Sequence, residues 1–345
     1  MTGPAALTAE HASAWEGPLV DGFGRVHSDL RISVTDRCNI RCFYCMPAEN
    51  VRFKPREELL TFEEITRFVH VASRLGIHKL RITGGEPLVR QDLHKLVGML
   101  SGIPGIRDLA LTTNGMLLAE QAAALRQAGL RRLNISLDTL SPQVFRQITR
   151  RDGLDRVLEG IAAAQRVGFD SIKLNAIAIR GITEAEVVPL ARFARERGLE
   201  LRFIEFMPLD ADGRWQQDQV LSGAEIVRLL EDAFGPLEAV PPQHPGQPAS
   251  DYRFADGGGL VGFINPVTQP FCHDCNRLRL TAEGQVRNCL FSLVEWDARA
   301  LLRGHAGDDE LARLIRQCVA AKKAGHGINS EEFARPQRAM YQIGG

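Results

Sequence analysis

Three cysteines near the N-terminal end of the chain have the spacing of a metal site. Cys38, Cys42 and Cys45 form a C-x3-C-x2-C pattern directly after a strand-like run at residues 30–34. Thiolates hold iron–sulfur clusters, normally with one thiolate per iron. Three thiolates on a four-iron cluster leave one iron open to a small molecule, and an open coordination position allows chemistry. Zinc would need a fourth ligand, and no His lies within ten residues of the triple, so we favour the cluster.

A second triple lies near the C-terminal end, where Cys272, Cys275 and Cys289 have the spacing C-x2-C-x13-C. Like the first triple, it suits a four-iron cluster with one open iron. A zinc site also stays open here, because His273 or another group could complete four ligands. The second triple therefore has two interpretations, a cluster with an exchangeable position or a closed structural zinc site.

Two arginines follow the second triple directly. Arg277 and Arg279 flank Leu278, and on a strand residues two apart share a face. Guanidinium groups bind phosphate oxygens and purine edges through paired hydrogen bonds, so the pair suits an anionic nucleotide. The alternative is an exposed arginine pair on an edge strand.

Six of the seven cysteines belong to the two triples. The seventh, Cys318, recurs with Leu311, Leu314 and Ile315 at helical spacing, which favours a core position. An odd count in two close groups is typical of a cofactor protein rather than of a disulfide framework. Exposed clusters and free thiols persist in reducing compartments, so we expect a cytoplasmic protein.

Composition excludes several classes of partner. The formal net charge is zero, so there is no global field that would favour nucleic acid or a membrane surface. An anionic ligand must instead be held by locally placed Lys and Arg. No apolar run approaches the roughly 20 residues of a membrane span, and the N-terminus lacks the pattern of a signal peptide.

From residue 30 onward the chain alternates short strand-like runs with longer helical stretches. Such repetition predicts a parallel sheet with helices outside it. The strand candidates are residues 30–34, 79–83, 108–112, 132–137, 171–179 and 200–206. The helical candidates include residues 62–75, 117–128, 155–167 and 184–197. Six units rather than eight indicate an α/β fold with an incomplete, TIM-like (β/α)6 barrel.

The chain divides into three expected parts. Residues 1–21 are rich in Ala and Gly without a strong period and are predicted to form a flexible arm. Residues 22–235 contain the partial barrel. Prolines then lead into a smaller α+β region, residues 236–345, which carries the second triple and ends in Gly-Gly.

Polar residues alternate with apolar ones along the expected barrel strands. Helices must cover an apolar outer face, so the polar set should point inward. That set comprises Arg31, Arg81, Asn134, Ser136 and Lys173. Unpaired buried charge is strongly destabilising, so the interior must hold water or a polar, anionic ligand. Residues 201–207 break the alternation.

Gly84-Gly85-Glu86-Pro87 follows the second expected strand, on the same rim as the first triple. One interpretation is a tight turn, since glycine and proline are common turn residues. The other is a ligand site, because barrel enzymes keep their active sites at the carboxyl ends of the strands.

The first triple, with aromatic Tyr44 before its last cysteine, resembles the signature of radical S-adenosylmethionine (SAM) enzymes. The wider string at residues 30–47, LRISVTDRCNIRCFYCMP, is similar to the GTP 3′,8-cyclase family, and the similarity extends from about Gly22 to Gly345. The resemblance implies a lyase that uses SAM and two [4Fe-4S] clusters. Its implied reaction is the radical cyclisation of GTP to (8S)-3′,8-cyclo-7,8-dihydroguanosine 5′-triphosphate, which begins molybdenum cofactor biosynthesis.

The resemblance also implies roles for individual residues. The ligands of the first cluster would be Cys38, Cys42 and Cys45, and those of the second Cys272, Cys275 and Cys289. The SAM contacts would be Tyr44, Gly85, Ser136 and Met207. The GTP contacts would be Arg31, Arg81, Thr112, Lys173, Arg277, Leu278 and Arg279. The catalytic group would comprise the first three cysteines, Arg277, Arg279 and the terminal Gly344 and Gly345, although residue type alone predicts a frayed tail there.

The implied partners are GTP, an electron donor such as flavodoxin or ferredoxin, and a downstream pterin-forming enzyme, and a homodimer is compatible. Two other functions are compatible with part of this pattern. A peptide-modifying radical SAM enzyme with an auxiliary cluster should carry additional C-terminal cysteines. A metal-stabilised scaffold or electron carrier without enzymatic activity would need neither the inward-facing cations nor the Gly-Gly-Glu-Pro turn.

Overall fold

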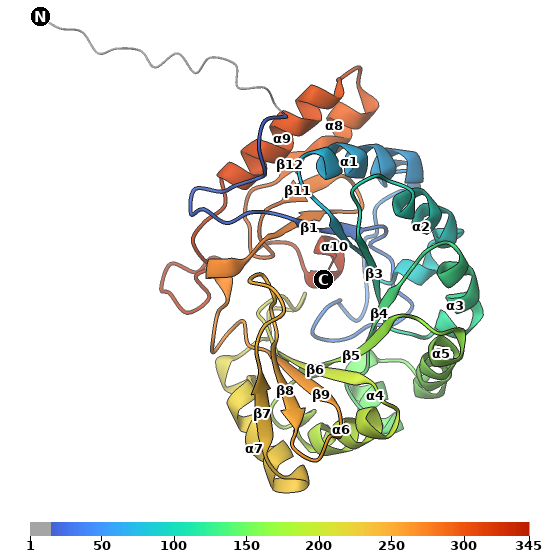
Figure 1. Cartoon of the computed structure of the whole chain (residues 1–345), viewed down its shortest axis with the longest axis vertical. Coiled ribbons are helices and arrows are strands. Elements are labelled where there is room, and N and C mark those ends of the chain that lie inside the picture. The colour runs from blue at the N-terminus through green and yellow to red at the C-terminus, as the bar shows by residue number, and fades with distance from the viewer. Residues whose placement is uncertain (1–14, 345) are drawn as a thin grey trace, which may run out of the picture.

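The computed structural model of the chain describes residues 15–344. Within them the strands form one sheet in the order β12-β11-β10-β1-β2-β3-β4-β5-β6-β9-β8-β7. Its six parallel central strands are β1 (Asp29–Ser33), β2 (Lys79–Thr83), β3 (Asp108–Thr113), β4 (Arg132–Ser136), β5 (Ser171–Ala178) and β6 (Glu200–Glu205). The sheet curves around the C-terminal end of the chain (Figure 1). The predicted incomplete barrel is therefore confirmed.

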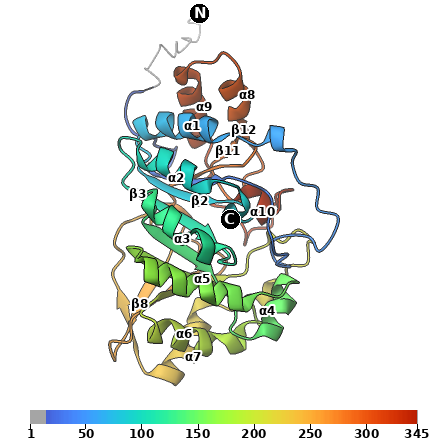
Figure 2. The same cartoon turned by 90° about the vertical axis from the view of Figure 1, so that its right-hand side faces the viewer.

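Helices cover the outer face of the sheet, as Figure 2 shows for the first five. They are α1 (Phe62–Arg74), α2 (Leu93–Ser101), α3 (Leu118–Gln127), α4 (Pro142–Thr149), α5 (Leu154–Val167), α6 (Val187–Glu196) and α7 (Gly223–Phe234). A capping box begins α1: the Thr61 hydroxyl accepts from the Glu64 N–H at 3.1 Å, and the Glu64 carboxylate accepts from the Thr61 N–H at 2.7 Å. No helix within residues 15–344 has the length and hydropathy needed to cross a membrane.

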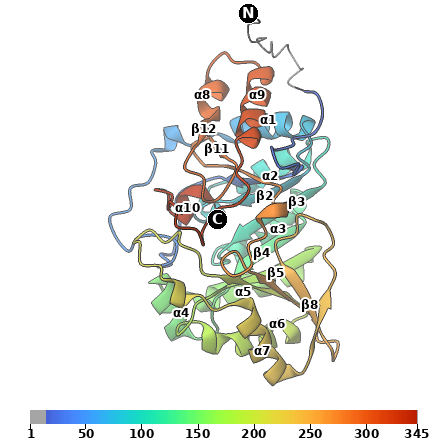
Figure 3. The same cartoon turned by 90° about the vertical axis from the view of Figure 1, so that its left-hand side faces the viewer.

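The C-terminal region adds its strands to both edges of the barrel sheet. These strands are β7 (Leu237–Val240), β8 (Ser250–Phe254), β9 (Leu260–Ile264), β10 (Arg277–Leu280), β11 (Gln285–Arg287) and β12 (Trp296–Asp297). β10 runs parallel to β1, and β9 runs parallel to β6. Figure 3 shows α8 (Ala298–Arg303) and α9 (Asp308–Ala320) beside α1 at one end of the molecule. The two triples can therefore face one interior although they lie far apart in sequence.

The apolar face of the sheet forms the core with the helices. Leu30, Ile32 and Leu80 are fully buried in it. β6 breaks this polar alternation, as the sequence indicates, because apolar Ile204 faces the interior and Glu205 is buried on the other side. The Glu205 carboxylate is satisfied there by backbone N–H groups of the loop after β9.

The segment just before β1 is packed rather than extended from the fold. Leu19 is fully buried, and the Asp21 carboxylate accepts a 2.6 Å hydrogen bond from Nε of Arg25. Asp21 also lies 3.0 Å from Nε2 of the buried His27. Residues 1–14 of the predicted flexible arm lie outside the described residues.

Candidate active site

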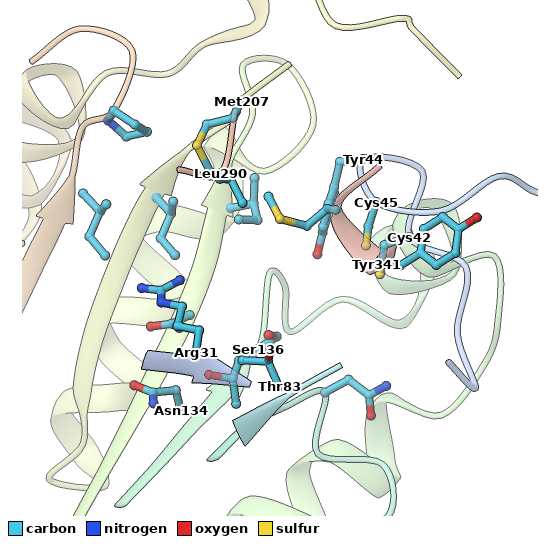
Figure 4. A pocket seen from close by; sticks show the side chains of 18 of the residues that line it. Arg31, Cys42, Tyr44, Cys45, Thr83, Asn134, Ser136, Met207, Leu290 and Tyr341 are labelled. Carbon is cyan, nitrogen blue, oxygen red and sulfur yellow. The ribbon is translucent and has the colours of Figure 1, made fainter. Parts of the chain in front are cut away.

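A cavity of about 330 Å³ opens among the loops that follow the parallel strands. All six cysteines of the two triples line it. Its walls come from the inward faces of the barrel strands, including Arg31 on β1 and Asn134 and Ser136 on β4. Figure 4 shows these side chains directed into the cavity, with Cys42 and Cys45 on a separate wall. The structure thus joins the two cysteine patterns in one site.

The first triple lies on the loop that follows β1. Cys42 is buried, and its carbonyl accepts a 2.9 Å hydrogen bond from the N–H of Cys45. The intervening Phe43 donates its N–H to the carbonyl of Ile148 on α4 at 3.1 Å. These backbone contacts hold the loop over the barrel with its sulfurs toward the cavity.

The surroundings of these sulfurs fit an iron–sulfur cluster. Burial raises the pKa of the Cys38 thiol to about 11 and also raises the pKa values of the Cys42 and Cys45 thiols. Thiolates so close together in a buried site require positive charge, which iron supplies. No three His, Cys, Asp or Glu side chains within residues 15–344 converge tightly enough to hold a single metal ion. A four-iron cluster does not need that convergence, because each thiolate binds a different iron.

Gly85 lies where the loops after β1 and β2 touch. Its N–H donates a 2.6 Å hydrogen bond to the carbonyl of Thr35. A Cβ atom at this position would lie 2.4 Å from the carbonyl oxygen of Arg37, so a larger residue would force the loops apart. The turn and the ligand interpretations of this motif are therefore compatible, since the tight backbone contact lies on the cavity wall.

Glu86 connects three loops beneath the first triple. Its buried carboxylate accepts hydrogen bonds from the Thr113 hydroxyl and the Asn114 N–H, both at 2.7 Å. The Asn114 side chain in turn donates to Asn39 at 2.7 Å and lies 3.8 Å from the Cys38 sulfur. Burial raises the pKa of Glu86 to about 7. The sequence pattern singled out the turn but not this supporting role.

Tyr44 is anchored at the opposite side of the first triple. Its hydroxyl donates a 2.6 Å hydrogen bond to Asp138, whose other oxygen accepts from the Ile177 N–H at 2.8 Å. Burial raises the pKa of Asp138 to about 6. Ser136 and Met207, two of the predicted SAM contacts, line the same cavity (Figure 4). The alternation along β4 predicts that Asp138 faces inward with Asn134 and Ser136, but the sequence pattern assigned it no role in the site.

Three arginines that line the cavity stand in register across neighbouring strands. Arg31 on β1 pairs with Arg279 on β10 and with Arg81 on β2. Burial lowers the pKa of Arg31, and the charges of Arg279 and Arg81 lower it further. Among the described residues, Nε of Arg31 and the hydroxyl of Thr112 are buried without a hydrogen-bond partner. This row of like charges with free donors fits an anionic ligand.

The second triple also lies against positive charge. Burial opposes ionisation of Cys275, but the Arg277 guanidinium and the Lys322 ammonium lower the pKa of this thiol to about 6. Nζ of Lys322 lies 3.3 Å from the Cys275 sulfur. The guanidinium of Arg277 also lies 4.9 Å from the centre of the Phe271 ring. A thiolate is therefore readily formed here, as metal ligation requires.

Two family models match successive parts of the chain. The chain matches the Radical SAM superfamily over residues 32–194 and Molybdenum Cofactor Synthesis C over residues 199–328. A GTP 3′,8-cyclase of Rhodopirellula baltica is 54% identical over 330 residues, which cover 95% of this chain and 92% of that protein. This chain belongs to the GTP 3′,8-cyclase family. Another member, from Acidothermus cellulolyticus, is 50% identical over 88% of this chain and 84% of its own length.

Two solved structures with the same fold share less sequence with this chain. Streptococcus suis SuiB bound to S-adenosylmethionine aligns with a TM-score of 0.59 at 16% identity, over 82% of this chain and 63% of that one. Native anSMEcpe with bound AdoMet aligns with a TM-score of 0.58 at 14% identity, over 91% and 94%. These similarities support the radical SAM partial barrel.

Two GTP contacts predicted from the GTP 3′,8-cyclase resemblance are not among the described residues that line the cavity. Nζ of Lys173 forms a 2.5 Å ion pair with Glu200 on the next strand. Leu278 is buried in the core, facing away from its two arginine neighbours. Their roles stay predictions. Arg202, which the sequence pattern did not single out, lines the cavity and donates a 2.7 Å hydrogen bond to Glu200.

The described end of the tail contacts an arginine that lines the cavity. After α10 (Met340–Ile343), the carbonyl of Gly344 accepts a 2.6 Å hydrogen bond from Arg279. Gly344 has φ +76°, and a Cβ atom there would lie 2.7 Å from the Thr83 hydroxyl and 2.8 Å from Cβ of Ser33. Only glycine fits between the ends of β1 and β2. The predicted catalytic residue Gly345 lies outside the described residues.

Proposed function

We propose that this chain catalyses the SAM-dependent radical cyclisation of GTP to (8S)-3′,8-cyclo-7,8-dihydroguanosine 5′-triphosphate, the first step of molybdenum cofactor biosynthesis. The observation that carries the proposal is one cavity lined by both cysteine triples and by the arginine row. The cysteine triples suit the iron–sulfur clusters that radical chemistry uses, and the arginine row suits a triphosphate. Family membership supports the same assignment.

The first triple would hold a [4Fe-4S] cluster through Cys38, Cys42 and Cys45 and leave one iron for the amino and carboxylate groups of SAM. When bound and reduced, this cluster would supply the one electron that cleaves SAM into methionine and a 5′-deoxyadenosyl radical. The chain's own part is to hold SAM in place. The close backbone contact at Gly85 shapes the rim, while Tyr44 is fixed by its hydrogen bond to Asp138.

The arginine row would bind the triphosphate of GTP. Arg31, Arg81 and Arg279 line the cavity side by side, and each charge-assisted hydrogen bond to an anion contributes about 1.5–3 kcal/mol. The partnerless hydroxyl of Thr112 would supply a further donor. The same interactions relieve the repulsion among the guanidiniums, so nucleotide binding and local stability are coupled.

Cys272, Cys275 and Cys289 would hold a further [4Fe-4S] cluster, which would offer a coordination position for the guanine. Arg277 lies beside these cysteines and would contact the nucleotide together with Arg279. The arginine row would hold the triphosphate of GTP and the second centre would hold the guanine. With GTP held at both ends, the ribose C3′ would lie near the radical source and C8 would lie near C3′. Such alignment lowers an activation barrier by about 7–11 kcal/mol in favourable cases. The buried walls also keep water away from radical species.

The tail would complete the site. Gly344 lies beside Arg279, Thr83 and Ser33, where it closes the space between the arginine row and the strand ends. Gly345, the next residue in the sequence, is proposed as a catalytic residue. Gly has no side chain, so its backbone can approach a substrate closely.

The proposed partners follow from this chemistry. An electron donor such as flavodoxin or ferredoxin would reduce the first cluster, and a pterin-forming enzyme would consume the cyclised nucleotide. A cytoplasmic location suits both the thiol ligands and GTP. We further propose that the chain can form a homodimer. The proposed division at residues 22–235 and 236–345 separates the two triples.

The decisive experiment is anaerobic incubation of the reconstituted protein with dithionite, SAM and GTP deuterated at C3′. The hydrogen taken from C3′ should appear in 5′-deoxyadenosine. The nucleotide should lose that deuterium, gain one proton and one electron, and elute apart from GTP. Reactions without reductant or with ATP in place of GTP are the controls. Formation of 5′-deoxyadenosine without deuterium or without a new nucleotide would contradict the proposed function.

A further inference from the structure

The C-terminal end of α9 contacts every cysteine-bearing segment of the second triple. One contact comes from Asn288, the residue before Cys289. Its side-chain amide donates a 2.8 Å hydrogen bond to the carbonyl of Cys318 near the end of α9. Asn288 and Cys318 are both buried. The loop that carries Cys289 is therefore fixed to this helix end.

The second contact runs through Arg25, from the segment before β1. Nη1 of Arg25 donates to the carbonyl of Cys272 at 2.7 Å and to that of Ala324 at 2.8 Å. Nη2 donates to the carbonyl of Lys323 at 2.7 Å. Asp21 fixes the same guanidinium through Nε. One buried arginine thus joins the residues after α9 to the first cysteine of the triple.

The third contact is made by Lys322 itself. Its ammonium donates to the Cys275 sulfur at 3.3 Å and to the carbonyl of Arg277 at 3.0 Å. The residue is only 5% exposed. A buried ammonium needs a negative partner, because losing its hydration is costly. The Cys275 thiolate is such a partner, and Arg25 and Asn288 hold the helix end that presents the lysine.

We propose that Lys322 is a positioning residue of the second centre, which holds the Cys275 sulfur toward the cavity and raises the reduction potential of the cluster bound there. The inference rests on the proposed second cluster. Hydrogen bonds to cluster sulfurs and nearby positive charge stabilise the more negative, reduced form. Through the Arg277 carbonyl, the same ammonium would also fix the start of β10, which carries the two arginines of the nucleotide site.

A redox titration tests this inference on the full-length chain in which Cys38, Cys42 and Cys45 are all Ala, so that only the second cluster remains. Electron paramagnetic resonance follows its reduction. Lys322→Met keeps the chain length but removes the charge and the donors, and its midpoint potential should shift to more negative values. Lys322→Arg should restore most of the shift. Lys323→Met is the matched control, because this neighbouring side chain is exposed.

The outcomes are distinguishable. An unchanged potential in Lys322→Met at full iron content would overturn the inference, as would an equal shift in Lys323→Met. Loss of iron from Lys322→Met alone would support the holding role. If Lys322→Met does not fold, Lys322→Gln is the second test, because glutamine keeps a hydrogen-bond donor but carries no charge. A midpoint potential in Lys322→Gln equal to that of the parent chain would overturn the inference. If the parent chain with Lys322 binds no iron, the proposed second cluster itself is wrong.

Discussion

The guanidinium of Arg279 donates a 2.6 Å hydrogen bond to the carbonyl of Gly344, the last residue that the structure describes. Arg279 also stands in register with Arg31 on the adjacent strand. One side chain therefore belongs to both the arginine row and the tail. The position of the tail and the geometry of the proposed triphosphate site cannot change independently.

Replacing Gly344 by Ala should displace the tail. The added Cβ would lie within 3 Å of Thr83 and Ser33, and φ +76° is unfavourable for alanine by about 1 kcal/mol. We expect kcat for GTP cyclisation to fall at least about tenfold, which corresponds to ~1.4 kcal/mol, while the melting temperature changes little. Product formation and thermal unfolding are the measurements.

Gly257→Ala provides the matched control for the tail. Gly257 has φ +81° but has open space around its Cβ position, on an exposed turn. It therefore imposes similar backbone strain without the collision. Equal losses of kcat in the two variants would show that strain alone, and not the tail's place in the site, explains the effect.

Arg31→Met should weaken GTP binding and leave SAM binding intact. Losing one charge-assisted contact of about 1.5–3 kcal/mol corresponds to roughly a tenfold to hundredfold rise in Kd. Removing one of three like charges in register should also raise the melting temperature of the GTP-free protein. Calorimetric titrations with GTP and with SAM, and thermal unfolding, measure the three effects. Exposed Arg107→Met is the control, and a parallel loss of SAM affinity in Arg31→Met would argue against a specific triphosphate contact.

Glu86→Gln should alter the pH dependence of stability. Burial raises the pKa of Glu86 to about 7 from its ordinary 4.5, so the folded protein binds this proton more tightly than the unfolded chain. The corresponding stability is complete below pH 4.5 and is lost as the pH rises through 7. The variant lacks this loss, so between these limits its free energy of unfolding should gain on the order of 2–3 kcal/mol relative to the unaltered chain.

Urea unfolding at a series of pH values between 4.5 and 7 measures that difference. Glu49→Gln serves as the control, because Glu49 is exposed and should give a constant difference. A flat difference for Glu86→Gln would mean that the carboxylate stays ionised in the folded protein throughout this range.

The two clusters should be separable by iron analysis. The reconstituted chain should bind about eight irons and eight sulfides, since each cluster contains four of each. Cys42→Ala should retain about four irons and lose SAM cleavage. Cys275→Ala should retain about four irons and still release 5′-deoxyadenosine. Zinc in place of iron at the second triple would contradict the guanine-binding assignment.

The barrel strands were predictable because local alternation determines them. Leu80 and Ile82 flank Arg81, and this short pattern indicates both the strand and the direction of the arginine. The same reasoning did not identify Arg202, because the next inward residue on β6 is the apolar Ile204. Polar alternation reveals the inward residues of a strand only when all of them are polar. The cavity also accepts apolar side chains such as Ile204, and there the pattern fails.

Contacts between distant segments could not be predicted from local pattern. The register of Arg31 with Arg279 depends on β10 pairing with β1 across the whole barrel. Lys173 was expected to face a ligand, but its neighbour in the ladder is Glu200, whose carboxylate binds the ammonium. The contact of Arg25 with Cys272 joins residues 247 positions apart. Such pairs follow from topology, and topology emerges only when the sheet is assembled.

The pairing of β10 with β1 and of β9 with β6 also has a consequence for biosynthesis. While the final third of the chain is still on the ribosome, both of these earlier strands lack one neighbour and present unpaired backbone groups, which invite association with other nascent chains. The metal ligands of the first triple emerge early, but the walls that enclose them arrive last. We therefore expect the iron–sulfur clusters to be inserted after translation has ended.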